Sequence, residues 1–148
     1  PDGKTLAYIY QVDEQNFGQV MLYNLDAERS IALGEAPEHA GALEWSPDGR
    51  HLLLDSGTGV ARQLTVVEVA SGAVLYETSA LGYAWSPDGL HLALGLRQPL
   101  QTPISLETGD SVSLVILTLE TGGSQVIFEG TPERLYFPRV WLPDEKNP

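Results

Sequence analysis

The feature of this sequence that most constrains its fold is an internal repeat of ten residues. Trp-Ser-Pro-Asp-Gly-Arg-His-Leu-Leu-Leu at residues 45–54 returns as Trp-Ser-Pro-Asp-Gly-Leu-His-Leu-Ala-Leu at residues 85–94. A shorter copy begins at Pro1, and a degenerate copy begins at Trp141. The prolines of successive copies are 46, 40 and 56 residues apart. A period of this size is typical of repeat architectures, in which each copy is one supersecondary unit.

Each copy predicts four short strands. Pro-Asp-Gly predicts a turn, because Pro presets φ, Asp bonds its own backbone and Gly tolerates the left-handed region. The strand before this turn is expected at residues 42–45, 82–85 and 138–141, and the strand after it at 6–12, 52–55 and 92–96. A third strand, rich in β-branched residues, is expected at 20–23, 64–69 and 114–119, and a fourth at 30–33, 73–77 and 125–128. Helical periodicity is absent.

Four-stranded units at this period are typical of β-propeller blades. We therefore expect an all-β chain of antiparallel strands, one domain over residues 1–148. Its units are expected at residues 1–41, 42–81 and 82–137, with a closing inner strand at 138–148. Propellers have about 4–8 blades, so about three blades and one strand predict a partial propeller. Either the chain is a fragment of a longer protein, or two copies form a six-bladed homodimeric ring in which the Trp141 strand lies beside the partner's Leu6 strand.

The repeat pattern resembles that of a known family. Trp-Ser-Pro-Asp-Gly-x-x-Leu-x-Leu, followed by an apolar strand and a Thr-Gly or Ser-Gly turn, is similar to the TolB-type, WD-like β-propeller repeat. The same repeat occurs in the propellers of prolyl-oligopeptidase-like peptidases. The resemblance implies a blade scaffold and transfers no active-site residue; the last copy departs from it at Leu142 and Glu145. The repeat residues expected to be structural are Trp45, Pro47, Asp48, Gly49, Trp85, Pro87, Asp88, Gly89, Trp141, Pro143 and Asp144.

Composition excludes several functions. The 148 residues include 20 acidic and 8 basic side chains, for a net charge of -12, which argues against binding nucleic acid or an anionic membrane. No stretch approaches the roughly 20 apolar residues of a membrane-spanning helix, so no membrane insertion is expected. Without cysteine, the chain has no disulfide framework and no thiol nucleophile. We expect a periplasmic or extracellular location.

A binding surface is expected in the loops between the second and third strands, on the face opposite the Pro-Asp-Gly turns. These loops are expected at residues 13–18, 56–62 and 97–111. The last is long for a loop without secondary structure, and such loops are often functional. The candidate residues for binding a protein partner are Asp13, Glu14, Asn16, Phe17, Arg97, Gln98, Gln101, Thr102 and Glu107.

No motif for catalysis or for a cofactor is present. His51 and His91 occupy the same repeat position, which predicts a structural role. The sequence contains no Gly-x-Ser-x-Gly nucleophile elbow and no glycine-rich phosphate loop before a helix. Asp13, Glu14 and Asn16 lack the Asp-x-Asp-x-Asp-Gly pattern of a calcium loop. We expect neither a cofactor nor a catalytic residue.

The leading hypothesis is a non-catalytic propeller scaffold that mediates protein–protein interaction. One alternative is the substrate-gating propeller of a prolyl-oligopeptidase-type serine peptidase whose hydrolase domain is absent from this chain. Another is a small-ligand or carbohydrate sensor with its ligand in a central channel. For that reading the inner strands offer few polar groups, since Glu44 corresponds to Ala84 and Val140 in the other copies.

Overall fold

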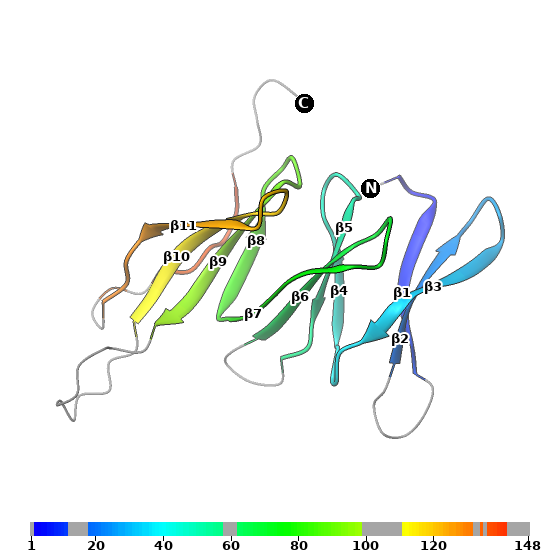
Figure 1. Cartoon of the computed structure of the whole chain (residues 1–148), viewed down its shortest axis with the longest axis horizontal. Coiled ribbons are helices and arrows are strands. Elements are labelled where there is room, and N and C mark those ends of the chain that lie inside the picture. The colour runs from blue at the N-terminus through cyan, green and yellow to red at the C-terminus, as the bar shows by residue number, and fades with distance from the viewer. Residues whose placement is uncertain are drawn as a thin grey trace. The chain divides into compact units, whose positions relative to one another are not determined.

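The computed structural model describes residues 2–11, 18–57, 62–98, 111–131, 134 and 136–141. Within these ranges the chain forms eleven strands and no helix (Figure 1). The strands make three antiparallel sheets, one of three strands and two of four. The predicted all-β class is therefore confirmed.

Each sheet is a meander of strands consecutive in the sequence, which we call a blade. Blade 1 has the order β1-β2-β3, blade 2 β4-β5-β6-β7 and blade 3 β8-β9-β10-β11. Blade 1 consists of β1 (Thr5–Gln11), β2 (Gly18–Asn24) and β3 (Arg29–Ala36). Blade 2 consists of β4 (Ala42–Trp45), β5 (His51–Asp55), β6 (Arg62–Glu68) and β7 (Val74–Ala80). Blade 3 consists of β8 (Gly82–Trp85), β9 (His91–Gln98), β10 (Ser111–Thr118) and β11 (Gly123–Phe128).

The Pro-Asp-Gly segments are tight turns between the first two strands of blades 2 and 3. Gly49 and Gly89 have φ angles of 73° and 72°, in the left-handed region that a side chain makes unfavourable. The bond from Gly49 N–H to the Ser46 carbonyl spans 2.9 Å, and its counterpart from Gly89 to Ser86 also spans 2.9 Å. The two turns therefore share one geometry.

The expected loop bounds were wrong at strand ends, since Gly18, Arg62 and Ser111 begin strands β2, β6 and β10. Arg97 and Gln98 were assigned to a loop, but both lie in β9, opposite Val112 and Ser111 of β10. The ladder continues through them because both residues find backbone partners in β10. Most other strands are also longer than predicted, whereas β4 and β8 have the expected bounds.

The inner strand expected at residues 138–141 is not formed in the structure. Residues 136–141, which we call the Trp141 segment, have no strand pairing with any described residue. The segment instead lies against blade 3: Tyr136 N–H donates to the Val112 carbonyl at 3.1 Å, and Trp141 Nε1 donates to the Ala84 carbonyl at 3.0 Å. A strand requires a neighbouring strand for its backbone groups, and no described residue supplies one.

The chain divides into two compact units, Pro1–Thr78 and Ser79–Pro148. In the first, side chains of blades 1 and 2 form a common core, against which Trp45 packs. The buried members of this core are Val20, Ala36, Leu52, Leu54 and Val67. In the second unit, the buried apolar side chains include Trp85, Leu92, Leu94, Val112, Val115 and Leu117.

Candidate functional site

The loop residues predicted to bind a partner fall mostly outside the described residues. Arg97 is exposed near the end of β9, and Gln98 ends that strand. The other candidate residues lie outside the described ranges, and they are Asp13, Glu14, Asn16, Phe17, Gln101, Thr102 and Glu107. Pro143 and Asp144 of the last motif copy also lie outside these ranges. The predicted binding surface therefore stays a prediction.

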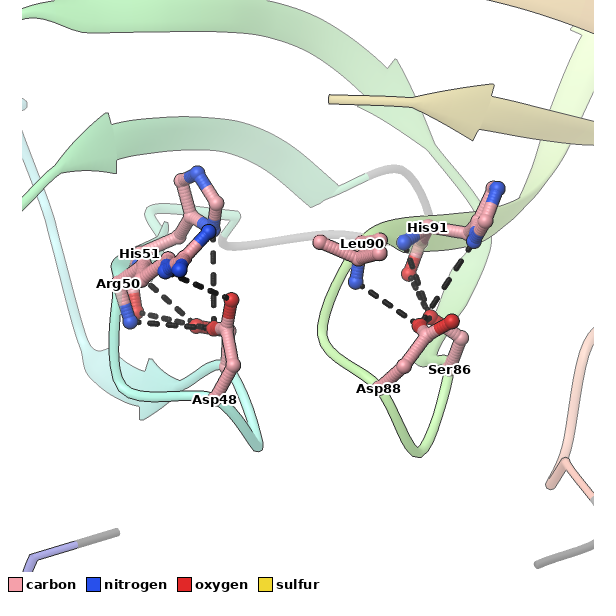
Figure 2. A network of polar contacts seen from close by, with 8 residues as sticks. Asp48, Arg50, His51, Ser86, Asp88, Leu90 and His91 are labelled. Carbon is pink, nitrogen blue, oxygen red and sulfur yellow. Dashed lines mark hydrogen bonds and ion pairs between the residues drawn. The ribbon is translucent and has the colours of Figure 1, made fainter. Parts of the chain in front are cut away.

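The Pro-Asp-Gly turns contain a polar network that the sequence interpretation missed (Figure 2). Ser46, which follows the motif Trp, is fully buried. Its hydroxyl donates to Asp48 Oδ1 at 2.6 Å and accepts the backbone N–H of His51 at 2.9 Å. Asp48 Oδ1 also accepts the backbone N–H of Arg50 at 3.1 Å. One hydroxyl and one carboxylate oxygen thus accept the backbone N–H groups of Arg50 and His51.

Blade 3 repeats this network with the same donors and acceptors and similar distances. Ser86 is 2 % exposed, and its hydroxyl donates to Asp88 Oδ1 at 2.6 Å and accepts the backbone N–H of His91 at 2.9 Å. Asp88 Oδ1 also accepts the backbone N–H of Leu90 at 2.9 Å. The recurrence of Ser between Trp and Pro in both full copies was the sequence signal for this role.

The combination of Ser, Asp and His in these turns is not a catalytic triad. In a triad, the serine hydroxyl donates to the histidine, which is oriented by the aspartate. Here the Ser46 hydroxyl is buried and donates to Asp48, and the Nδ1 of His51 lies 3.9 Å from Asp48 Oδ1. The Nδ1 of His91 lies 3.7 Å from Asp88 Oδ1. These hydrogen bonds stabilise the turn, and the buried Ser46 hydroxyl is not exposed to a substrate.

Hydrogen bonds within the turns lower the pKa values of Asp88 and Asp2. The bond from the Ser86 hydroxyl, followed by the bond from Leu90 N–H, holds the pKa of Asp88 below its ordinary value, although burial opposes the shift. In the first copy, Asp2 accepts the backbone N–H groups of Lys4 and Thr5 at 2.8 and 3.0 Å. These bonds lower the pKa of Asp2. Both carboxylates are thereby stabilised in the ionised form.

An ion pair between a buried carboxylate and a half-exposed guanidinium lies at the opposite end of blade 2. Asp55, at the end of β5, is 6 % exposed and forms a close ion pair with Arg62 Nη1 at the start of β6. Its other oxygen, Oδ1, accepts the backbone N–H of Gly57 at 3.2 Å. Next to it, Ser56 N–H donates to the Gln63 carbonyl at 2.9 Å. These contacts fix the positions of the residues at the base of the loop between β5 and β6.

Sequence analysis did not single out Asp55 or Arg62. The positions equivalent to Asp55 in the other two copies are Ile9 and Gly95, so the repeat gave no signal for an acidic residue there. The available signal was a lone Asp after three leucines in a strand, with Arg62 seven residues later across a hairpin loop.

A pocket of about 530 Å³ lies between blades 1 and 2, at the end where the turns are. Its lining consists of Asp2, Thr5, Trp45, Pro47, Asp48, Gly49 and Val69. Both carboxylates of this lining accept hydrogen bonds within their own turns. Across the ranges that the structure describes, no group of three or more His, Asp or Glu side chains could hold a metal ion. The described residues of the pocket therefore include no assembled metal site.

The described part of the chain contains no helix long and apolar enough to cross a membrane.

Comparison with known proteins identifies the fold. No protein-family model matches the sequence, and no curated protein matches it. Among solved structures, the chain is similar to the β-propeller domain of the Trilobed protease from Pyrococcus furiosus, which is described as having an open velcro topology. The TM-score is 0.61 at 21% identity, over 88% of this chain and 41% of that one.

Two further structures show the same likeness in different enzymes. A prolyl endopeptidase matches with a TM-score of 0.61 at 17% identity, over 87% of this chain and 21% of that one. An oligogalacturonate lyase in complex with manganese matches with a TM-score of 0.58 at 20% identity, over 87% of this chain and 38% of that one. The chain thus spans less than half the length of these structures. At these identities the likeness shows the fold alone, which is an open, partial β-propeller.

Proposed function

We propose that the chain is a non-catalytic β-propeller scaffold that binds another protein through the loops between the second and third strands of its blades. The observation that carries this proposal is the ion pair between the buried Asp55 and the half-exposed Arg62. Burying a carboxylate costs several kcal/mol unless it is paired and hydrogen-bonded. Here the ion pair and the Gly57 N–H pin a loop base, and loops positioned by a rigid scaffold are common binding elements.

Exposed side chains at the same ends of the other blades fit this proposal. Tyr10, near the end of β1, is 56% exposed, and Arg97 is exposed near the end of β9. Tyr and Arg are enriched among the residues that dominate binding energy in protein interfaces. At the opposite end of the blades, the Ser and Asp side chains serve the turns themselves. We therefore place the binding surface on the loop ends.

The experiment is affinity capture from an extract of the source cells, with quantitative mass spectrometry of the bound proteins. Tyr10→Ala and Arg97→Ala are compared with Leu25→Ala and Leu90→Ala, whose side chains are 54% and 37% exposed at the turn ends. We expect a specific partner whose capture falls by about tenfold in the first pair, as for an interface residue worth about 1.4 kcal/mol. Equal losses in both pairs, or no protein above background, would contradict the proposal.

A second candidate is the gating propeller of a prolyl-oligopeptidase-type peptidase. It is favoured by the likeness to a prolyl endopeptidase and to the propeller domain of a protease. It predicts that the full gene encodes an α/β-hydrolase domain with a nucleophile elbow. The full-length protein should then cleave peptides, whereas this chain alone should not. For the sensor alternative, Glu44 is exposed on β4, and no other described feature favours it.

A further inference from the structure

A second pocket, which we call the Arg29 pocket, lies within the first unit and has a volume of about 310 Å³. Its lining consists of Thr5, Leu22, Asn24, Ala27, Arg29, Ile31 and Val69. All of these residues except Val69 belong to blade 1. The volume lies at the lower end of the roughly 300–1,000 Å³ that small-molecule sites occupy, so the pocket suits a small ligand.

The floor of the Arg29 pocket is an ordered part of the sheet of blade 1. Thr5 lies opposite Asn24, and Asn24 lies opposite Arg29, so these three residues form a row across the strands. In the neighbouring row, Leu22 lies opposite Ile31. Residues in register, and residues two apart on one strand, project to the same face of a sheet. A polar row therefore borders an apolar row on the face that Val69 of blade 2 covers.

Contacts between blades 1 and 2 hold the wall opposite this floor. The Val69 N–H donates to the Arg50 carbonyl at 2.9 Å. In the turn that follows β6, a Cβ on Gly72 would lie 2.5 Å from the Leu33 carbonyl oxygen of β3, so the turn is in close contact with blade 1. A pocket with fixed walls binds a ligand without a large ordering cost.

The polar row offers hydrogen-bond donors that the fold does not use. Asn24 Oδ1 accepts the Ala27 N–H at 2.7 Å. The Asn24 NH2 group and the Arg29 guanidinium make no hydrogen bond or ion pair with a described residue. Arg29 is exposed, and the side chain of Ile31 beside it is 54% exposed. The pocket thus presents a cation and an amide donor next to accessible apolar surface.

The other two blades show that the scaffold does not require an arginine at this position. The row equivalent to Thr5, Asn24 and Arg29 consists of His51, Glu68 and Ala73 in blade 2 and of His91, Thr118 and Gly123 in blade 3. Both blades form their strands with a small residue in place of Arg29. The charge of Arg29 therefore has no part in building a blade.

We propose that the Arg29 pocket binds a monocarboxylate with a short apolar chain. A guanidinium matches a carboxylate with two parallel hydrogen bonds, and the Asn24 NH2 group supplies a further donor. The apolar chain of the ligand lies against Leu22, Ile31 and Val69. A singly charged anion is favoured over phosphate, because the chain has a net charge of -12 and a single guanidinium leaves the second charge of a dianion unpaired.

Titration of the isotope-labelled chain with hexanoate, followed by NMR of the backbone amides, tests the ligand class. We expect saturable shifts that centre on Asn24, Arg29 and Ile31. Hexylamine has the same chain with the opposite charge, and inorganic phosphate has no chain, so neither should give saturable shifts at these residues. The absence of saturable shifts with hexanoate, or equal binding of hexylamine or phosphate, would overturn the proposal.

Two variants that remove the same charge test the residue. Arg29→Gln should raise the Kd for hexanoate by about tenfold. The matched control is Arg50→Gln, because the Arg50 side chain is 75% exposed and does not line the pocket; its Kd should change by less than about twofold. Amide spectra check that both variants fold as the parent does. Equal losses in the two variants would also overturn the proposal, which concerns the turn ends and is independent of protein binding by the loops.

Discussion

Ser46 shows at the scale of a single residue how this fold uses its polar side chains. Its hydroxyl donates to Asp48 and accepts from His51 N–H while fully buried. Ser46→Ala leaves both groups without this partner, which typically costs about 1–3 kcal/mol. Equilibrium unfolding in urea measures the loss. The control is Ser30→Ala, because Ser30 bonds Tyr8 on the exposed surface; it should change stability by less than about 0.5 kcal/mol. Equal losses would contradict the role of Ser46.

The turn of blade 3 predicts a pH effect at Asp88. Because the Ser86 hydroxyl is the main cause of the lowered pKa of Asp88, Ser86→Ala should move that pKa up toward its ordinary value. A carboxyl group whose pKa is lower in the folded state contributes stability above the pKa of the unfolded chain, and this contribution is lost as the pH falls through the folded pKa. The acid-dependent part of stability should therefore be smaller in the variant.

Carboxyl NMR titration of Asp88 checks this directly. Ser30→Ala serves again as the control, and its Asp88 should titrate as in the parent. An unchanged pKa of Asp88 in Ser86→Ala would show that the hydroxyl is not the cause of the shift.

At the scale of an element, Gly130 sets how the chain leaves β11. A Cβ on this residue would lie 2.2 Å from the Val112 carbonyl oxygen of β10, far inside van der Waals contact. Gly130→Ala should therefore shift the backbone and destabilise the second unit by about 1–3 kcal/mol. Gly34 in β3 is the matched control, since a Cβ there meets nothing within 4 Å. Thermal unfolding of both variants measures the loss of stability. An unchanged melting temperature for Gly130→Ala would contradict the close contact between Gly130 and Val112.

The Asp55–Arg62 pair makes a prediction for the loop base of blade 2. Removing one partner of a fully buried pair costs about 3–5 kcal/mol. Because the Arg62 side chain is 50% exposed, water can replace part of its interaction, and Arg62→Ala should cost less, about 1–2 kcal/mol. Adding Asp55→Asn should recover part of this loss, because it removes the unpaired buried charge. A double-mutant cycle by equilibrium unfolding measures the coupling, and a coupling near zero would contradict it.

Sequence could predict those elements that local signals delimit. The inner strands β4 and β8 were placed at their observed bounds, because a Trp and a Pro-Asp-Gly turn mark their ends. Arg97 was misassigned, because the end of a hairpin ladder depends on the partner strand rather than on local residues. The strand expected at residues 138–141 failed for the same physical reason, since no described strand pairs with it.

The candidate site was less predictable than the fold. Repetition identified the turn residues, yet the role of Ser46 depends on burial and on a hydrogen bond from His51 N–H, which follow from the folded turn. Asp55 and Arg62 occur in a single copy, and their ion pair depends on where two strands end. Repeats therefore predict the scaffold well, whereas a feature of one blade carries no repeated signal.

At the scale of the whole molecule, the fold and the function have different support. Likeness to three solved structures over 87–88% of this chain shows a partial β-propeller. The same fold occurs in a protease, a prolyl endopeptidase and a lyase, so it does not define an activity. Protein binding by the loops is a proposal that rests on the ion pair of Asp55 and Arg62.

The central claim is that the chain binds another protein through the loop ends of its blades. Affinity capture with the parent chain and with the Tyr10→Ala and Leu25→Ala variants compares an exposed side chain near a loop end with one at a turn end. The account predicts a partner whose capture falls by about tenfold in Tyr10→Ala and is unchanged in Leu25→Ala. Equal losses in the two variants, or no protein captured above background, would contradict the claim.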